Sequence, residues 1–109
     1  KRYGELLAGL PVRLPVEASW AKAVYHLYVV EVEHRDACLA FLRNRGVMAQ
    51  IHYPASVHLQ PCYADLGYRP GDFPAAEAAV ERILSLPLYP ELTENQMRVV
   101  AETLAAFFR

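Results

Sequence analysis

The chain has 109 residues, of which 54% are hydrophobic and 21% charged, and its formal net charge is −1. The length fits a single domain, and the missing basic excess argues against nucleic acid as a partner, because phosphate backbones attract proteins with a positive field. The high hydrophobic share, with slightly few charges, predicts surface that another domain or subunit covers.

The first 22 residues are predicted to be the end of an interdomain helix followed by a linker. Apolar residues at helical spacing indicate a helix over residues 1–10, and two nearby prolines indicate an extended, irregular segment after it. Residues 23–109 are predicted to form the domain itself.

A β-α-β unit is expected next. Residues 24–33 (VYHLYVVEVE) are rich in β-branched and aromatic side chains on both faces, which predicts a central strand. Residues 35–45 form a short amphipathic helix, and Gly46 after it suits the left-handed position beyond a helix end. Residues 47–53 alternate again and predict a second strand.

The last third predicts a loop, a helix, a short strand and a final helix. Residues 62–72 contain several turn residues, residues 74–85 have helical apolar spacing, and prolines confine residues 86–90 to a sheet edge. Thr93 and Gln96 form a capping box that begins the final helix. The order predicts a two-layer α/β domain of the α+β kind, with helices on a small, mostly antiparallel or mixed sheet.

The segment Ile51–Pro61 has the composition of a site edge. It places His52, Tyr53 and His58 next to prolines that stiffen the chain. A metal site is not expected, since a six-residue gap does not fix two imidazoles on one ion and no third ligand is near in sequence. The ordinary alternative is a surface histidine beside a tyrosine packed in the core.

No self-contained catalytic machinery is expected in this chain, and no residue is assigned to catalysis or to cofactor binding. Cys38 and Cys62 lack C-x-x-C spacing and a secretory context, so we expect reduced thiols in a cytoplasmic protein. The only lysines, Lys1 and Lys22, are not placed to form a Schiff base. No apolar run is long enough to cross a membrane. The chain does not begin with Met, which indicates a piece of a longer polypeptide.

Several short motifs occur together in a specific order and spacing. They are Tyr25-His26-Leu27-Tyr28-Val29-Val30, Arg35-Asp36, Arg45-Gly46-Val47, Ile51-His52-Tyr53-Pro54, His58-Leu59-Gln60-Pro61, Gly71-Asp72-Phe73-Pro74-Ala75-Ala76-Glu77 and Leu84-Ser85-Leu86-Pro87-Leu88-Tyr89-Pro90-Glu91-Leu92-Thr93. Over essentially the whole chain, this set resembles the C-terminal small domain of the pyridoxal-phosphate-dependent nucleotide-sugar aminotransferases, the DegT-like family.

The resemblance implies a homodimeric transaminase of fold type I. Its large domain, outside these 109 residues, would carry the Schiff-base lysine, the acid that pairs the pyridinium nitrogen and most phosphate contacts of pyridoxal phosphate. The reaction would move an amino group, typically from glutamate, to a keto group of a nucleotide-linked deoxysugar. This chain would cover the active site and contact both its own large domain and the second subunit.

The resemblance also implies roles for particular residues. His52 and Tyr53 match the family's His-Tyr at the site rim, and His58 matches the histidine after the proline turn. We expect these three to position the substrate by hydrogen bonds to sugar hydroxyls or the diphosphate, while His26 and Tyr28 pack behind them. Two alternatives remain open: a non-catalytic regulatory relative of the family, and a free-standing ferredoxin-like module that binds a small ligand.

Overall fold

A three-stranded antiparallel sheet forms the centre of the computed structural model, which describes residues 1–109. β2 (Tyr28–Val32) lies between β1 (Val12–Arg13) and β3 (Ile83–Leu86). Every second residue of β2 is buried, beginning with Tyr28, and the residues between them are half-buried. The strand is central as predicted, but it begins at Tyr28 and not at residue 24, and only one of its faces is fully buried.

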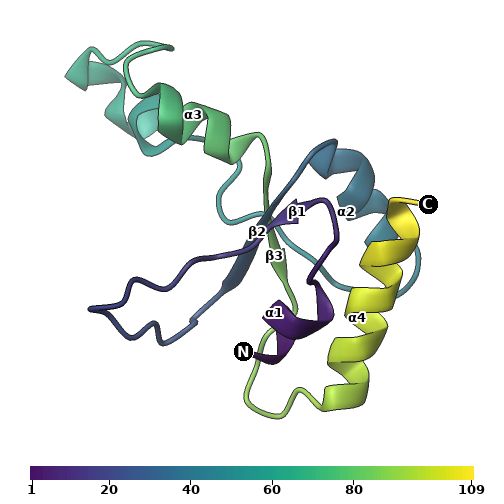
Figure 1. Ribbon diagram of the computed structural model, residues 1–109. Coiled ribbons are helices and arrows are strands. Elements are labelled where there is room, and N and C mark those ends of the chain that lie inside the picture. The colour runs from purple at the N-terminus through teal and green to yellow at the C-terminus, as the bar shows by residue number, and fades with distance from the viewer.

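The sheet packs against three helices, and a fourth lies apart. α2 contacts β2 and β3, and α4 packs against α1 and α2 (Figure 1). Figure 1 shows α3 standing away from this body. The helices are α1 (Arg2–Leu6), α2 (Arg35–Arg43), α3 (Pro74–Val80) and α4 (Glu94–Phe107), and two 3-10 helices cover Val57–Leu59 and Pro61–Leu66.

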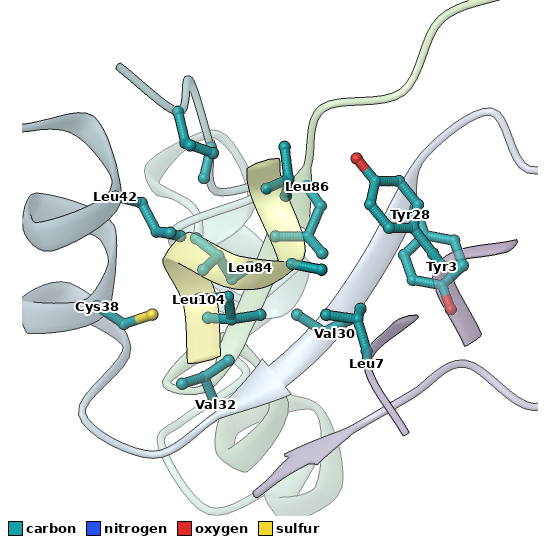
Figure 2. Close-up of a cluster of buried hydrophobic side chains, with 14 residues drawn as sticks. Tyr3, Leu7, Tyr28, Val30, Val32, Cys38, Leu42, Leu84, Leu86 and Leu104 are labelled. Atoms are coloured by element: carbon teal, nitrogen blue, oxygen red, sulfur yellow. The ribbon is translucent and has the colours of Figure 1, made fainter. Parts of the chain in front are cut away.

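The core lies between the sheet and the helices (Figure 2). Leu42 of α2, Leu84 of β3 and Leu104 of α4 are each 0% exposed. Burying such a side chain stabilises the fold by about 1.5–3 kcal/mol. These contacts hold α2, β3 and α4 as one unit.

Two segments project from this unit. The radius of gyration is 15.4 Å, whereas a compact chain of this length would have about 13 Å. The first segment is the β1–β2 loop, residues 14–27, and the second is the arm, residues 53–80 (Figure 1). Most of the exposed large apolar side chains lie on these segments, which agrees with the expectation of covered surface.

The fold class is confirmed as α+β, but the second predicted strand is wrong. Residues 47–53 make only an isolated bridge, between Gln50 and Ser85. The backbone groups of Ala49 bond to other parts of the chain. Its carbonyl accepts from Nε–H of Arg43 at 3.1 Å, and its N–H donates to the carbonyl of Val47 at 2.9 Å. These bonds lie on the side away from β3. On the side of β3 the ladder does not continue, because Pro87 has no N–H and the carbonyl of Ile83 accepts from Nη1 of Arg35 at 3.2 Å.

The predicted helix over residues 74–85 is too long, and the strand expected at 86–90 lies earlier. α3 ends at Val80, and the strand covers Ile83–Leu86. Three consecutive residues of this strand, from Leu84 onward, are buried. A short run that is covered on both faces has no period of two, so its spacing also fits a helix.

Other predicted boundaries shift by less. α1 ends at Leu6 rather than at residue 10, and the predicted linker contains β1, whose Val12 pairs with Val32. Gly46 has φ +80°, as its place beyond α2 requires. The capping box is confirmed, since the side chains of Thr93 and Gln96 each accept from the other's backbone N–H.

The predicted boundary at residue 22, between the N-terminal linker and the domain, stays a prediction. Two residues of the N-terminal segment, Tyr3 and Leu7, lie in the same core as the sheet, at 3% and 1% exposure. The first turns of the chain therefore pack as part of this body.

Candidate functional site

The strongest candidate site is an open hollow of about 390 Å³, which we call the His52 hollow. Its wall is formed mainly by two segments. One is the segment that follows α2, and the other is β3 with the residues directly after it. Polar side chains are few, and apolar ones surround them, as is typical of small-molecule sites. The lining residues are Leu27, Met48, Gln50, His52, Ser85, Leu86, Pro87, Leu88 and Tyr89.

His52 is held in this hollow by β3. Its Nδ1 lies 2.9 Å from Oγ of Ser85, which is 4% exposed. The bridge between Gln50 and Ser85 sets the backbone two residues earlier. The half-buried imidazole is therefore oriented by a buried strand, and Nε2 makes no hydrogen bond within the chain.

Tyr53 begins the arm and points away from the core. It is 67% exposed, and its ring lies edge-on to that of His52, with centroids 5.8 Å apart. The peptide bond between the two residues is cis. The ordinary alternative of a core-packed tyrosine is therefore wrong for this position.

His58 lies further along the arm, and its Nε2 is already bonded. Oε1 of Glu77 lies 3.0 Å from Nε2, and the His58 side chain is 8% exposed. The ring of Phe73 covers it, with centroids 4.8 Å apart. The imidazole thus ties the 3-10 helix at Val57–Leu59 to α3.

Glu77 organises the arm through several donors at once. Backbone N–H groups of Gly71 and Phe73 donate to its carboxylate at 2.9 and 3.3 Å. The N–H of Gly71 has the largest effect in lowering the pKa of Glu77, and Phe73 and His58 act in the same direction. The carboxylate therefore stays charged where the chain turns into α3.

The arm has its own hollow, of about 370 Å³, beside this pair. It is mostly apolar and is separate from the His52 hollow. Its lining residues are Val57, His58, Tyr63, Leu66, Tyr68, Phe73 and Ala76. The structure thus brings His52 and Tyr53 together but places His58 at a different hollow, and the substrate-binding role of all three stays a prediction.

The cysteines and the metal-ligating side chains form no further candidate site. Burial raises the pKa of Cys38 to about 11, whereas a nucleophilic thiol needs a lowered pKa. Cys62 is exposed, and both cysteines are free. No cluster of three or more metal-ligating side chains occurs. None of the helices has the length and apolar character that crossing a membrane requires.

The larger hollow beside β1, of about 750 Å³, contains none of the predicted site residues. Of its charged side chains, Glu31 pairs with Arg13 at 3.3 Å and with Arg82 at 3.5 Å, and Glu33 makes no ion pair. The three paired charges have little left to offer a charged ligand.

Sequence reasoning missed Gln50 and Ser85 in the His52 hollow. Ser85 was assigned to a helix, so its side chain had no expected relation to His52. The available signal was a single hydroxyl inside the apolar run Ile83–Leu86, since a buried polar group needs a partner.

His26 was expected to pack behind the site, and this is wrong, since its side chain is exposed. Tyr28 was expected to pack there too; it is buried at 6% exposure, but its ring packs against those of Tyr3 and Tyr25, and it lines neither hollow. The chain turns before β2 begins, and Tyr25 has a φ of +49°. The alternation that would place His26 on the buried face therefore starts only at Tyr28.

Comparison with known proteins adds evidence of a different kind. The family model described as the DegT/DnrJ/EryC1/StrS aminotransferase family matches residues 1–105. The fold also matches the X-ray crystal structure of S. venezuelae DesV, with a TM-score of 0.93 and 38% identity over 97% of this chain and 29% of that one.

Curated relatives give the same result. The chain is 44% identical over 107 residues to the erythromycin biosynthesis sensory transduction protein EryC1 of Saccharopolyspora erythraea, covering 97% of this chain and 29% of that protein. It is 43% identical over 96 residues to the dTDP-3-amino-3,4,6-trideoxy-alpha-D-glucose transaminase of Streptomyces venezuelae, covering 86% of this chain and 25% of that protein. The chain thus spans less than a third of the length of these relatives.

Proposed function

The chain belongs to the DegT/DnrJ/EryC1/StrS aminotransferase family, and from this premise we propose that it is the C-terminal part of a transaminase for nucleotide-linked deoxysugars. The amino group comes from glutamate and goes to a keto group of the sugar. The observation that carries this proposal is the 43% identity to a dTDP-sugar transaminase, together with the family match along nearly the whole chain.

Pyridoxal phosphate would supply the electron sink that transamination needs. The residues of this chain do not fit it alone, because such enzymes hold the cofactor through a lysine, and Lys1 and Lys22 are both exposed and outside the His52 hollow. We therefore place the lysine, the acid beside the pyridinium nitrogen and the phosphate contacts on the rest of the polypeptide. No reaction step is assigned to these 109 residues.

The proposed task of this chain is to cover the active site and position the sugar. His52, Tyr53 and His58 are the residues proposed to bind the substrate. An imidazole N–H and a phenol O–H both donate to diphosphate or hydroxyl oxygens. Support comes from the open side of the His52 hollow and from the 67% exposure of Tyr53, since both leave polar atoms free for a ligand.

The proposed partners are the protein's own large domain and a second subunit in a cytoplasmic homodimer. Support comes from the β1–β2 loop, where Val16, Trp20 and Val24 are 88–92% exposed. Large apolar side chains that are this exposed mark surface that another domain or subunit covers.

A non-catalytic regulatory relative is the second candidate function. It is favoured by one observation, the description of EryC1 as a sensory transduction protein at 44% identity. Such a relative would have lost the Schiff-base lysine, so the residue at that position in the full-length protein separates the two functions.

The direct test uses full-length protein loaded with pyridoxal phosphate. It is mixed with glutamate and a dTDP- or UDP-linked keto sugar, and formation of 2-oxoglutarate is followed. We expect turnover from the full-length protein and none from the 109-residue piece alone. Sugar binding without any 2-oxoglutarate would contradict the transaminase proposal and support the regulatory one.

A further inference from the structure

Ser85 controls the segment that carries His52 through two kinds of contact. Its backbone N–H donates to the carbonyl of Gln50 at 2.8 Å, and its own carbonyl accepts from the N–H of Gln50 at 3.0 Å. Its hydroxyl lies 2.9 Å from Nδ1 of His52. One residue of β3 therefore sets both the path of the backbone and the orientation of the imidazole.

The burial of Ser85 favours one direction of this hydrogen bond. Ser85 is 4% exposed, and its hydroxyl has no other partner in the chain. If Nδ1–H of His52 donated, the hydroxyl hydrogen would be buried without an acceptor, and unpaired buried donors are rarer than under-used acceptors. The arrangement that satisfies the hydroxyl hydrogen within the chain has the hydroxyl donating to Nδ1, which leaves the proton of a neutral ring on Nε2.

Nε2 is then the nitrogen that a ligand meets. It makes no hydrogen bond within the chain and is not one of the buried polar atoms without a partner. The ring lines the His52 hollow, which is open to the surface. The diphosphate and keto oxygens of a nucleotide-linked sugar are acceptors, and an Nε2–H group is a donor that matches them.

We infer that Ser85 is a positioning residue: by donating to Nδ1, it holds His52 as an Nε2–H donor directed at an acceptor oxygen of the substrate. This inference rests on the proposed function, because it names how one proposed substrate ligand is oriented. Ser85 itself does not touch the substrate in this arrangement. Its effect passes entirely through the imidazole.

The first test is Ser85→Ala in the full-length enzyme. We expect the KM for the nucleotide-linked sugar to rise about tenfold, which corresponds to one hydrogen bond, with kcat unchanged within about twofold. Ser85→Thr keeps the hydroxyl and should restore the KM. Ser56→Ala is the matched control, because Ser56 is also 4% exposed but its hydroxyl has no partner.

The second test does not depend on turnover. Nitrogen-15 NMR of histidine-labelled full-length protein distinguishes a protonated from a bare ring nitrogen, and the His52 signals are those lost in His52→Gln. We expect protonated Nε2 and bare Nδ1 in the wild type, and a mixture of tautomers in Ser85→Ala. A merely structural role of Ser85 would change the melting temperature without changing this tautomer.

The two proposals fail in different ways. An Nδ1–H tautomer in the wild type overturns the inference about Ser85 and leaves the transaminase standing. The inference about Ser85 is also overturned if Ser85→Ala has the KM of the wild type while His52→Ala has a raised KM. Absence of transaminase activity contradicts the proposed function, and the NMR result then decides the inference by itself.

Discussion

The hydroxyl of Tyr3 donates a hydrogen bond of 2.7 Å to the carbonyl oxygen of Pro87, across 84 positions of the chain. Tyr3 is 3% exposed, and its ring packs against that of Tyr28 with centroids 5.0 Å apart. Pro87 follows β3 and lines the His52 hollow. The first helix therefore supports the backbone beside the candidate site.

Tyr3→Phe should lower the free energy of unfolding by about 1 kcal/mol, because it removes this one bond and keeps the ring. Urea unfolding followed by circular dichroism measures the change. The control is Tyr63→Phe, since Tyr63 lies on the arm, is 41% exposed and makes no hydrogen bond through its hydroxyl. An equal loss in both variants would show that the bond to Pro87 contributes nothing specific.

The same tyrosine should make the fold sensitive to alkali. Burial raises the pKa of Tyr3 to about 12, whereas the unfolded chain has a tyrosine pKa near 10. The folded state holds this proton longer, so its stability is fully present below about pH 10 and falls as pH rises toward about 12. Tyr3→Phe should therefore lose less stability than the wild type between pH 10 and 12.

Unfolding at a series of alkaline pH values measures that difference in slope. Burial also raises the pKa of Cys38, to about 11, but that contribution is common to both proteins and cancels in the comparison. Parallel stability curves for the wild type and Tyr3→Phe would contradict the assignment to Tyr3.

Thr93→Ala should cost about 1 kcal/mol of stability, because Thr93 caps α4. Its Oγ1 accepts from the N–H of Gln96 at 3.3 Å, and its own N–H donates to Gln96 Oε1 at 2.9 Å. Thr93→Ser keeps the accepting oxygen and should remain close to the wild type in thermal unfolding. If Ser and Ala replacements are equally damaging, the lost methyl group rather than the cap explains the change.

The capping box was predictable because it depends on neighbouring residues alone. The same is true of Gly46 after α2, which needs a positive φ, and of the apolar centre of β2. Local signals of this kind require no knowledge of the partner strand. They were enough to give the fold class and the order of most elements.

The elements that were mispredicted depend on distant contacts. Residues 47–53 alternate like a strand, but on the facing strand Pro87 has no N–H and Arg35 occupies the carbonyl of Ile83, and no pattern within residues 47–53 records this. Ile83–Leu86 reads as the end of a helix until the strand partner is known. The same error hid Ser85 from the candidate site, because the bridge at Gln50 is what brings His52 within reach of its hydroxyl.

Glu77→Ala should loosen the arm without unfolding the body. The carboxylate accepts from the N–H groups of Gly71 and Phe73 and pairs with His58. Hydrogen–deuterium exchange should become faster at Gly71 and Phe73, while the amides of β2 keep their protection. Glu81→Ala is the control, because Glu81 is exposed and its side chain makes no hydrogen bond or ion pair.

This contribution should also depend on pH. The pKa of Glu77 is lowered from its ordinary value by the N–H of Gly71 before any other group, so the contribution is present above the unfolded pKa and is lost as pH falls through the folded one. Intrinsic amide exchange slows as pH falls, so the quantity to compare is protection relative to the intrinsic rate at each pH. In the arm this protection should fall under acid in the wild type but change little with pH in Glu77→Ala. An equal loss of protection in both proteins would exclude Glu77 as the cause.

His52→Ala and His58→Ala should each raise the KM for the nucleotide-linked sugar in the full-length enzyme, by about tenfold for the loss of one hydrogen bond. Retention of pyridoxal phosphate, measured by its absorbance after gel filtration, should change little, because neither imidazole is proposed to touch the cofactor.

The structure adds a distinction between the two histidines. His58 is bonded to Glu77, so His58→Ala should also speed hydrogen exchange in the arm, whereas His52→Ala should not. His26→Ala is the control, since that exposed histidine lines neither the His52 hollow nor the arm hollow. Loss of cofactor with an unchanged KM would show that these histidines serve the cofactor and not the sugar.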